Sequence, residues 1–598
     1  MMRADLLTAP VEGLDEALAA ADAFDRALVA GLLRPQADQA ADLALFAQAL
    51  GGSPLASRVA EAAEKASAGA AGEDHFVALA AARTALLGAA ADALTARAAE
   101  AIGRPLGAVA DAAAADPAGT EGPGETVRPA GEPGAARANG DAKATGALGG
   151  GAPGGGESGG GESDGGGPAQ TGTPQGATAA IAANQATAAT NASGASGASG
   201  AATSSDTPAG GMPANLAAAA RSWLCDLARA GWRGLDHELA AGAAPVVSAM
   251  LPDPALRRAA ALLDGFAAEL AASCPGATLE RIPARRWGDL WARAMVLTLP
   301  GAMAAPAPGA ATGRLLPLGV DLHEHATAAQ AQVHAVFEPA DGGPARLVRA
   351  SVSAPKPDTV VGAGVWQLLR PHMSLLAAAA EGRSMDLADM PLTAEGDLLW
   401  DDARARTGEP ADAFATARVA LPAARAAATA PLDRHPARLA VPVFLEGYAP
   451  RRGDGGTLEF VFPGRGAAAA ATPTGEGAAA GAGGDAEAAS AVPVTPAASA
   501  QDTGAAVAVD ATRVPSAGPL TPEAVAASTA CIALLRWDAG TFRVQPLAVR
   551  TAVRKKTVAV HAGAWAAGTT DKLGAKAEKA ATDAVAVLRE RSGKLLRK

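Results

Sequence analysis

Two long tracts of low-complexity sequence constrain this chain more than any other feature. Residues 113–212 and 466–518 consist largely of Gly, Ala, Ser, Pro and Thr, and almost no large apolar side chain interrupts the first of them. Fixing the backbone of one residue costs roughly 1–2 kcal/mol, and such a composition has too little apolar surface to offset that cost. We therefore expect both tracts to be disordered linkers, which leaves about 450 residues for folded structure.

The sequence before the first tract has the apolar spacing of amphipathic helices. Residues 14–32 carry large apolar side chains near the helical period, and the long segment 73–102 does the same. Between these two segments, Ser53 and Pro54 are a signal for the start of a helix. Short connections between four such helices predict that residues 1–112 form an all-α helical bundle.

After the first tract, helical stripes continue to about residue 300 and the period then changes to two. Consecutive strand signals without alternating helices indicate an α+β domain with a largely antiparallel sheet over residues 213–569, with 466–518 as a disordered insertion. Residues 570–598 are predicted to form a basic C-terminal helix. The strands of the first group are expected near 314–324, 331–338 and 345–353.

Cysteine usage and the N-terminus indicate a cytoplasmic protein. The three cysteines lie far apart and form no CxxC pair, which fits a reducing compartment. An acid at Asp5 and the lack of an early apolar run argue against a secretory signal. The most apolar stretch, around 290–311, is interrupted by Arg293 and three prolines, so no membrane span is expected. The excess of Ala, and of Arg over Lys, is typical of a GC-rich bacterial genome.

The formal net charge of −11 argues against a general nucleic-acid binder, because such binding depends on neutralising phosphates. The basic segment 570–598 is the local exception and could contact nucleic acid or a membrane surface. No aromatic residues accompany it, and a solvated helix accounts for its charge as well.

One short motif has the residue types of a metal site. In an extended strand Asp321, His323 and His325 point to the same face, and His334 could approach them from a hairpin partner. Three or four such side chains could bind zinc. The alternative is that they are polar residues on a solvated strand face. The predicted metal ligands are His323, His325 and His334.

Other motif searches predict no catalytic residue and no cofactor. Gly593-Lys594 has no upstream glycine at Walker spacing, and Gly362-Ala363-Gly364 lacks the third glycine of a dinucleotide loop. The cysteines lie beside apolar stripes and are expected to be buried core thiols. Two carboxylate pairs, Asp401 with Asp402 and Asp386 with Asp389, could support glycosidase-like or two-metal chemistry, but they are expected to be solvated.

The run from Leu14 to Leu33 and the segment EDHFVALAAARTALLG, from Glu73 to Gly88, carry a resemblance. They resemble uncharacterised actinobacterial proteins encoded beside genes for SWIM-type zinc-finger proteins and MoxR-type ATPases. The resemblance implies an accessory role next to such proteins. A SWIM finger needs a CxC pair and a Cys-His pair, which this chain lacks, so the resemblance assigns no active residue.

The leading functional hypothesis is a non-enzymatic accessory or scaffold protein that mediates protein–protein interaction. It follows from the lack of convergent catalytic residues and from the long tract 113–212 between the expected folded parts. The alternative is a metal-dependent hydrolase of an unfamiliar family that uses His323, His325 and His334. The sequence leaves the oligomeric state and the identity of any partner open.

Overall fold

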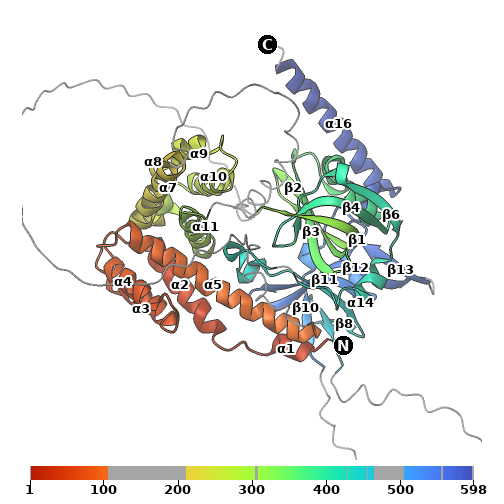
Figure 1. Ribbon diagram of the computed structural model, residues 1–598, viewed down its shortest axis with the longest axis horizontal. Helices are drawn as coiled ribbons and strands as arrows, with labels where there is room; N and C mark the ends of the chain where they lie inside the picture. The colour runs from red at the N-terminus through yellow and green to blue at the C-terminus, as the bar shows by residue number, and fades with distance from the viewer. Residues whose placement is uncertain are drawn as a thin grey trace, which may run out of the picture. The chain divides into compact units, whose positions relative to one another are not determined.

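The computed structural model describes residues 2–104, 211–302, 307–426, 428–453, 456–463, 504–553 and 556–595 (Figure 1). Helices precede the break at 105–210 and also follow it directly. Two mixed, mostly antiparallel sheets come after the second group of helices. The expected fold class, all-α and then α+β, is confirmed. The predicted linker 113–212 lies almost entirely outside the described residues, as does most of 466–518.

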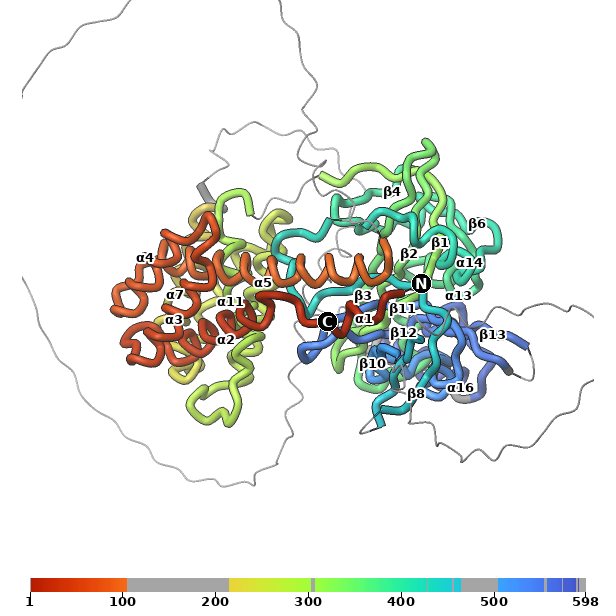
Figure 2. The backbone as a smooth tube through the Cα atoms, turned by 90° about the horizontal axis from the view of Figure 1, so that it is seen from below, coloured from red at the N-terminus to blue at the C-terminus, as the bar shows by residue number. Residues whose placement is uncertain are grey.

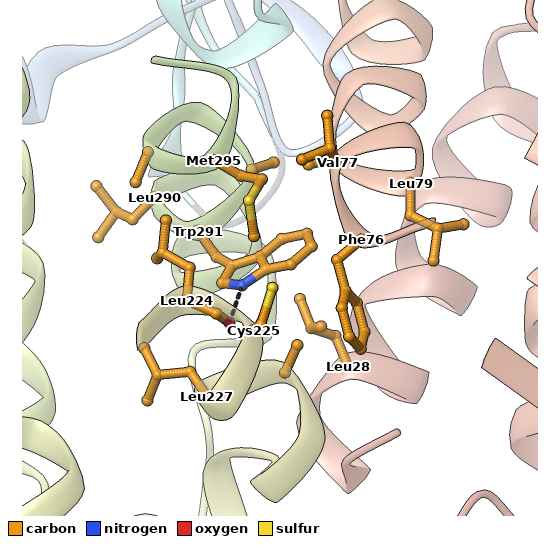
Figure 3. Packing of buried hydrophobic residues seen from close by; sticks show 14 of the residues in the cluster. Leu28, Phe76, Val77, Leu79, Leu224, Cys225, Leu227, Leu290, Trp291 and Met295 are labelled. Atoms are coloured by element: carbon orange, nitrogen blue, oxygen red, sulfur yellow. Dashed lines mark hydrogen bonds between the residues drawn. The ribbon is translucent and has the colours of Figure 1, made fainter. Parts of the chain in front are cut away.

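Helices from both sides of the break pack into one core, which we call the helical body. Trp291 lies between Phe76 of one group and Leu224 of the other, and its indole Nε1 donates to the Leu224 carbonyl at 2.9 Å (Figure 3). The first group is α2 (Leu14–Ala30), α3 (Ala37–Ala49), α4 (Ala56–Ser67) and α5 (Glu73–Ile102). The second group is α7 (Gly211–Ala230), α8 (His237–Ala241), α9 (Ala244–Met250), α10 (Arg257–Ala272) and α11 (Ala284–Leu297).

This packing differs from the division expected from the sequence. The sequence predicts that residues 213–300 form one α+β domain with the strands that follow them. The apolar stripes of residues 213–300, however, pack against one another and against α2 and α5. The helices on the two sides of the break therefore complete each other's core.

The helical body is an internal repeat with an offset of 200 residues. Helices α2 and α7 end at Ala30 and Ala230, and each is followed by a glycine with positive φ. The next helix begins at residue 37 in the first copy and at residue 237 in the second. A turn that contains proline follows at 53–54 in the first copy and at 253–254 in the second. In that turn the side-chain oxygen of Ser53 or Asp253 accepts a hydrogen bond from the N–H two residues later. Burial repeats as well; buried pairs include Phe24 and Leu224, Leu28 and Ala228, Leu50 and Met250, Ala66 and Phe266.

The two copies meet where their first long helices end. A Cβ on Gly31 would lie 2.8 Å from the Ala230 carbonyl oxygen, and a Cβ on Gly231 would lie 2.5 Å from the Gly31 nitrogen. Their φ values of +93° and +71° also favour glycine. Since equivalent residues contact each other, the copies are related by an approximate two-fold axis, as in an isologous dimer.

Helix α5 belongs to two cores. Its first half, including Phe76 and Leu79, packs in the helical body, and its second half, including Leu94 and Ala98, packs with α1 (Ala4–Thr8) against the second sheet. Among the described residues it is the one helix long and apolar enough to span a membrane, and 67% of its apolar segment is buried inside the protein. Its apolar surface is therefore explained by packing. The sequence had instead pointed to 290–311 as the most apolar stretch.

A buried ion pair fixes α5 within the helical body. Nε and Nη2 of Arg83 lie 2.7 and 2.9 Å from the carboxylate oxygens of Asp25, and both side chains are 2% exposed. Arg83 also donates to the Arg285 carbonyl on α11 at 3.1 Å. A Cβ on Gly288 would lie 2.2 Å from Asp25, so only glycine lets α11 approach this closely. The pair therefore joins three helices.

The first sheet, sheet A, closes on itself because β1 pairs with both β2 and β4. Its strands are β1 (Gly309–Glu324), β2 (Ala328–Pro339), β3 (Arg346–Pro355), β4 (Arg383–Leu392), β5 (Asp397–Leu398) and β6 (Ala405–Pro410). The three strands expected near 314–353 are thus confirmed. One face packs against α12 (Val365–Leu369) and α13 (Leu375–Ala380), and α12 in turn contacts α16 (Lys572–Leu595). The last of these is the predicted C-terminal helix.

The second sheet, sheet B, has the order β7-β11-β12-β10-β9-β8, with β13 also paired to β12. The strands of sheet B that Figure 2 labels lie together there. Its strands are β7 (Val441–Glu446), β8 (Ala449–Arg452), β9 (Leu458–Val461), β10 (Ala506–Val509), β11 (Ser528–Asp538), β12 (Thr541–Val553) and β13 (Lys556–His561). The expected insertion 466–518 is wrong at its end, because β10 lies within it and pairs with β9 and β12. The Ala-Val alternation buries Val507 and Val509, which is enough for a short internal strand.

Cleavage of the chain within 105–210 should leave the two halves together. A site-specific protease site placed there is expected to give fragments that co-elute in gel filtration, because each contributes half of one core. Gly231→Val, which inserts side-chain atoms at the contact between the copies, should weaken that association; Gly52→Val, at a position with open space, is the matched control. Fragments that separate without any substitution would contradict the shared core.

Loss of the buried guanidinium should destabilise the protein strongly. Arg83→Leu leaves Asp25 buried without a partner, and about 3–5 kcal/mol of unfolding free energy should be lost. The double variant Asp25→Leu with Arg83→Leu should recover much of that loss, because no charge is then buried alone. Urea unfolding of the three proteins measures both effects, and a single variant as stable as wild type would exclude the structural role of the pair.

Candidate functional site

One face of β1, β2 and β3 changes from apolar to polar along the strands. At one end Leu316, Val336 and Leu347 pack against Ile532 of sheet B. Farther along, the residues on the same face are polar. We call this set the polar layer; it comprises Asp321, His323, Gln330, Gln332, His334, Arg349, Ser351 and Ser353 of sheet A, and Arg536, Arg543 and Gln545 of sheet B.

Asp321 is the centre of the polar layer. Its side chain is 1% exposed, and it accepts hydrogen bonds from His323 Nε2 at 2.9 Å, Arg536 Nη2 at 2.6 Å and Gln545 Nε2 at 2.7 Å. Burial alone would raise its pKa, but the His323 hydrogen bond and the Arg536 charge hold that pKa well below its usual range. The carboxylate therefore stays ionised and holds the two sheets together.

A bulge in β1 brings Asp321 to this position. The register of β1 against β2 shifts between Pro317 and Gly319, which changes the face to which later residues point. A Cβ on Gly319 would lie 2.7 Å from Leu547 Cβ, so the sheets approach closely at that glycine. Beyond it, alternate residues of β1 face sheet B.

The structure gathers two of the three predicted histidines near Asp321. His323 is partly exposed and bonded to it, whereas His334 lies on the neighbouring strand, paired with Gly319, and is buried. His325 falls in the turn after β1, where its Nδ1 lies 3.1 Å from Thr327 Oγ1. No group of three His, Cys, Asp or Glu side chains in the described parts of the chain could hold a metal ion. Arg536 and Gln545 also occupy the carboxylate oxygens that a metal would need.

The polar layer is incompletely satisfied by protein partners. Of nine buried side-chain nitrogen and oxygen atoms without a hydrogen-bond partner among the described residues, five belong to it: two of Gln330 and one each of His334, Ser353 and Arg543. Such atoms cost roughly 1–3 kcal/mol each. Burial lowers the pKa of His334 to about 3, an effect that Asp321 opposes and the charge of Arg536 strengthens. Acidification should therefore weaken this contact between the sheets.

The chemistry available at the Asp321–His323 pair is limited. A buried carboxylate that orients an imidazole can support a general base. Here Arg536 shares the carboxylate, and no described Ser, Thr or Cys side chain hydrogen-bonds to His323. The geometry therefore fits a structural link better than a nucleophile–base pair.

The other motifs found in the sequence have structural roles. Asp402 Oδ1 accepts bonds from the Ser374 backbone N–H, the Ser374 hydroxyl and Trp400 Nε1, and Asp401 accepts from the Ala403 N–H. Gly364 is needed for packing, because a Cβ there would lie 2.8 Å from Ala581 Cβ on α16. These residues stabilise turns and a helix contact.

The predicted carboxylate pair Asp386 and Asp389 is also divided between two environments. Asp386 lies in β4 opposite Arg406. Asp389 has φ +55° and lies next to Thr312, its Oδ1 3.2 Å from the Thr312 hydroxyl.

The cysteines lie mainly in the interior. Cys225 and Cys531 are buried, and burial raises the pKa of both thiols, that of Cys225 to about 11. Cys274 is partly buried, and its thiol donates to the Leu270 carbonyl at 3.3 Å. A raised pKa disfavours the reactive thiolate.

Arg536 and Gln545 were not singled out from the sequence. Each stands between apolar neighbours in its strand, at Leu534-Leu535-Arg536-Trp537 and Val544-Gln545-Pro546. A polar residue between apolar neighbours in a strand signals a buried hydrogen bond. That signal gives no partner, however, since Asp321 is more than 200 residues away.

Replacement of His334 should reduce the pH dependence of stability. Its folded pKa lies below its unfolded value, so the unfolded state binds more protons and wild-type stability should fall as the pH drops below about 6.5. Between pH 6 and 4.5 wild type should lose roughly 2 kcal/mol more than His334→Gln. Urea unfolding at both pH values measures the difference, with the exposed His237→Gln as the matched control. Parallel losses in wild type and His334→Gln would contradict the assignment.

Comparison with known proteins gives no match: no family model, no curated protein and no solved structure is significantly similar to this chain. The resemblance of Leu14–Leu33 and Glu73–Gly88 to actinobacterial proteins stays a prediction.

Proposed function

We propose that this protein is a non-enzymatic accessory or scaffold protein that binds protein partners. The observation that carries the proposal is the set of exposed leucines on the helical body. Leu33, Leu45 and Leu251 are 57%, 45% and 50% exposed, although leucine is usually among the most buried residues.

Leu33 and Leu45 belong to the first copy of the repeat, and Leu251 belongs to the second. Leu33 is in the turn after α2, and Leu45 is in α3. Leu251 directly follows α9, the helix of the second copy that corresponds to the end of α3. Helix α3 buries Leu43 and Phe46 against the core, and Leu45 is a large apolar side chain on its outer side. This side chain is therefore available for contact with a partner.

The way in which three carboxylates are held supports a non-catalytic role. Each of the three accepts several hydrogen bonds within the protein. Asp321 links the two sheets, Asp402 holds a turn, and Asp25 links helices. Groups held in this way stabilise a scaffold.

The alternative, a metal-dependent hydrolase that uses His323, His325 and His334, has less support, because His325 lies apart and Arg536 competes for Asp321. Metal analysis of the purified full chain tests it. We expect less than one-tenth of an equivalent of zinc, manganese or iron. A stoichiometric metal that is lost in His334→Gln would favour the hydrolase.

Partner capture by leucine variants tests the scaffold. The tagged full chain should retain a protein from a native lysate, and Leu45→Asp combined with Leu251→Asp should reduce that protein at least tenfold. Val419→Asp, at a side chain that is 75% exposed on α14 (Ala413–Val419) beside the sheets, is the matched control. Equal capture by all variants would contradict the role of the helical body.

A further inference from the structure

Strand β13 is an exposed sheet edge. It pairs with β12, and no other described segment hydrogen-bonds to its outer side. Its first four residues, 556–559, are exposed, and Val558 is 41% exposed. The strand lies at the rim of sheet B in both views (Figures 1 and 2). Its main chain is thus accessible along most of its length.

The register identifies which backbone groups point outward. β12 and β13 pair without interruption from Val553 opposite Lys556 to Ala548 opposite His561. Just beyond them the Ala562 N–H donates to the Leu547 carbonyl at 2.8 Å. In an antiparallel pair the residues that bond to the partner strand alternate. Val558 and Val560 therefore bond to β12, and Thr557 and Ala559 direct their N–H and C=O groups outward.

The other edge strands of the two sheets carry protection that β13 lacks. Each contains a proline, which removes a donor: Pro410 in β6, Pro442 in β7 and Pro450 in β8. In β7 the Pro442 carbonyl also accepts a bond from Arg104 at 2.9 Å. Proteins commonly block edge strands with prolines, bulges or charges to prevent pairing with other chains. β13 has no proline and no bulge, and only Lys556 at its start.

The sequence at the start of this strand is basic. Arg554 and Lys555 directly precede Lys556 there, in a chain whose formal net charge is −11. Arg550 is engaged by Asp412 at 2.6 Å and lies 4.5 Å from the Phe414 ring centroid, whereas Lys556 is exposed at the start of the strand. The charge at this edge therefore complements an acidic partner.

We propose that β13 is a docking edge for an acidic, extended segment of a partner protein, which adds to sheet B as a further strand. Main-chain bonds to Thr557 and Ala559 would give affinity, and the basic residues would select acidic sequences. This inference rests on the proposed interaction function and names a partner class for it. A nucleic acid fits less well, because it has no peptide main chain with which to pair with the outward N–H and C=O groups of β13.

A defined peptide tests this edge directly. The probe is a fluorescent twelve-residue peptide of alternating Glu and Val, and anisotropy measures its binding to the full chain. Wild type should bind it, and binding should weaken as salt rises. Ala559→Pro removes an outward N–H without removing a bond to β12 and should weaken binding at least tenfold. Ala559→Thr retains the N–H and is the matched control.

Further measurements distinguish loss of the outward N–H in Ala559→Pro from misfolding and from a change of charge. Circular dichroism and thermal melting check that Ala559→Pro folds, and Lys556→Glu, which leaves the backbone unchanged, should also weaken binding. No binding to wild type, equal binding to Ala559→Pro, or equal binding of a Lys-Val peptide would overturn the inference. So would tighter binding of a single-stranded oligonucleotide. Leu45→Asp with Leu251→Asp should bind the peptide as wild type does, so failure at β13 is distinguishable from failure of the scaffold proposal.

Discussion

Helix α5 is the element on which the rest of the structure depends, because its buried surface is shared between two cores. Phe76 and Leu79 pack in the helical body, and Leu94 and Ala98 pack against sheet B. Arg83, between these halves, is fully buried and is held by Asp25. A buried charge requires its partner, so α2, α5 and α11 must assemble together.

Because of this dependence, the two copies of the internal repeat need each other to form a complete core. One copy alone would expose the side of α5 that faces α11, and the contact between Gly31 and Gly231 would be lost. The long tract between the copies therefore interrupts a single folded body in sequence and does not divide it in space. Asp321 has the corresponding role between the sheets, where one carboxylate receives bonds from both β11 and β12.

Much of the secondary structure could be predicted from the sequence, because apolar spacing in α2 and alternation in β1 to β3 are local properties. The repeat was missed because equivalent core positions carry side chains of different size in the two copies. Ala27 corresponds to Leu227, and Ala66 corresponds to Phe266. β10 was missed because its Ala-Val pattern has the composition of the tract around it. At the polar layer, strand alternation placed His323 beside Asp321, but β1 ends at Glu324 and leaves His325 in a turn. Arg536 and Gln545 come from strands distant in sequence, which no local pattern could pair with Asp321.

Hydrogen exchange of the intact chain, followed by mass spectrometry, tests the shared role of α5 most directly. The account predicts that amides in 76–87, in 90–101 and in α11 exchange slowly and at one common rate, because they are released by the same opening. Exchange of α2 to α5 as a separate, faster unit, with α11 still protected, would contradict it.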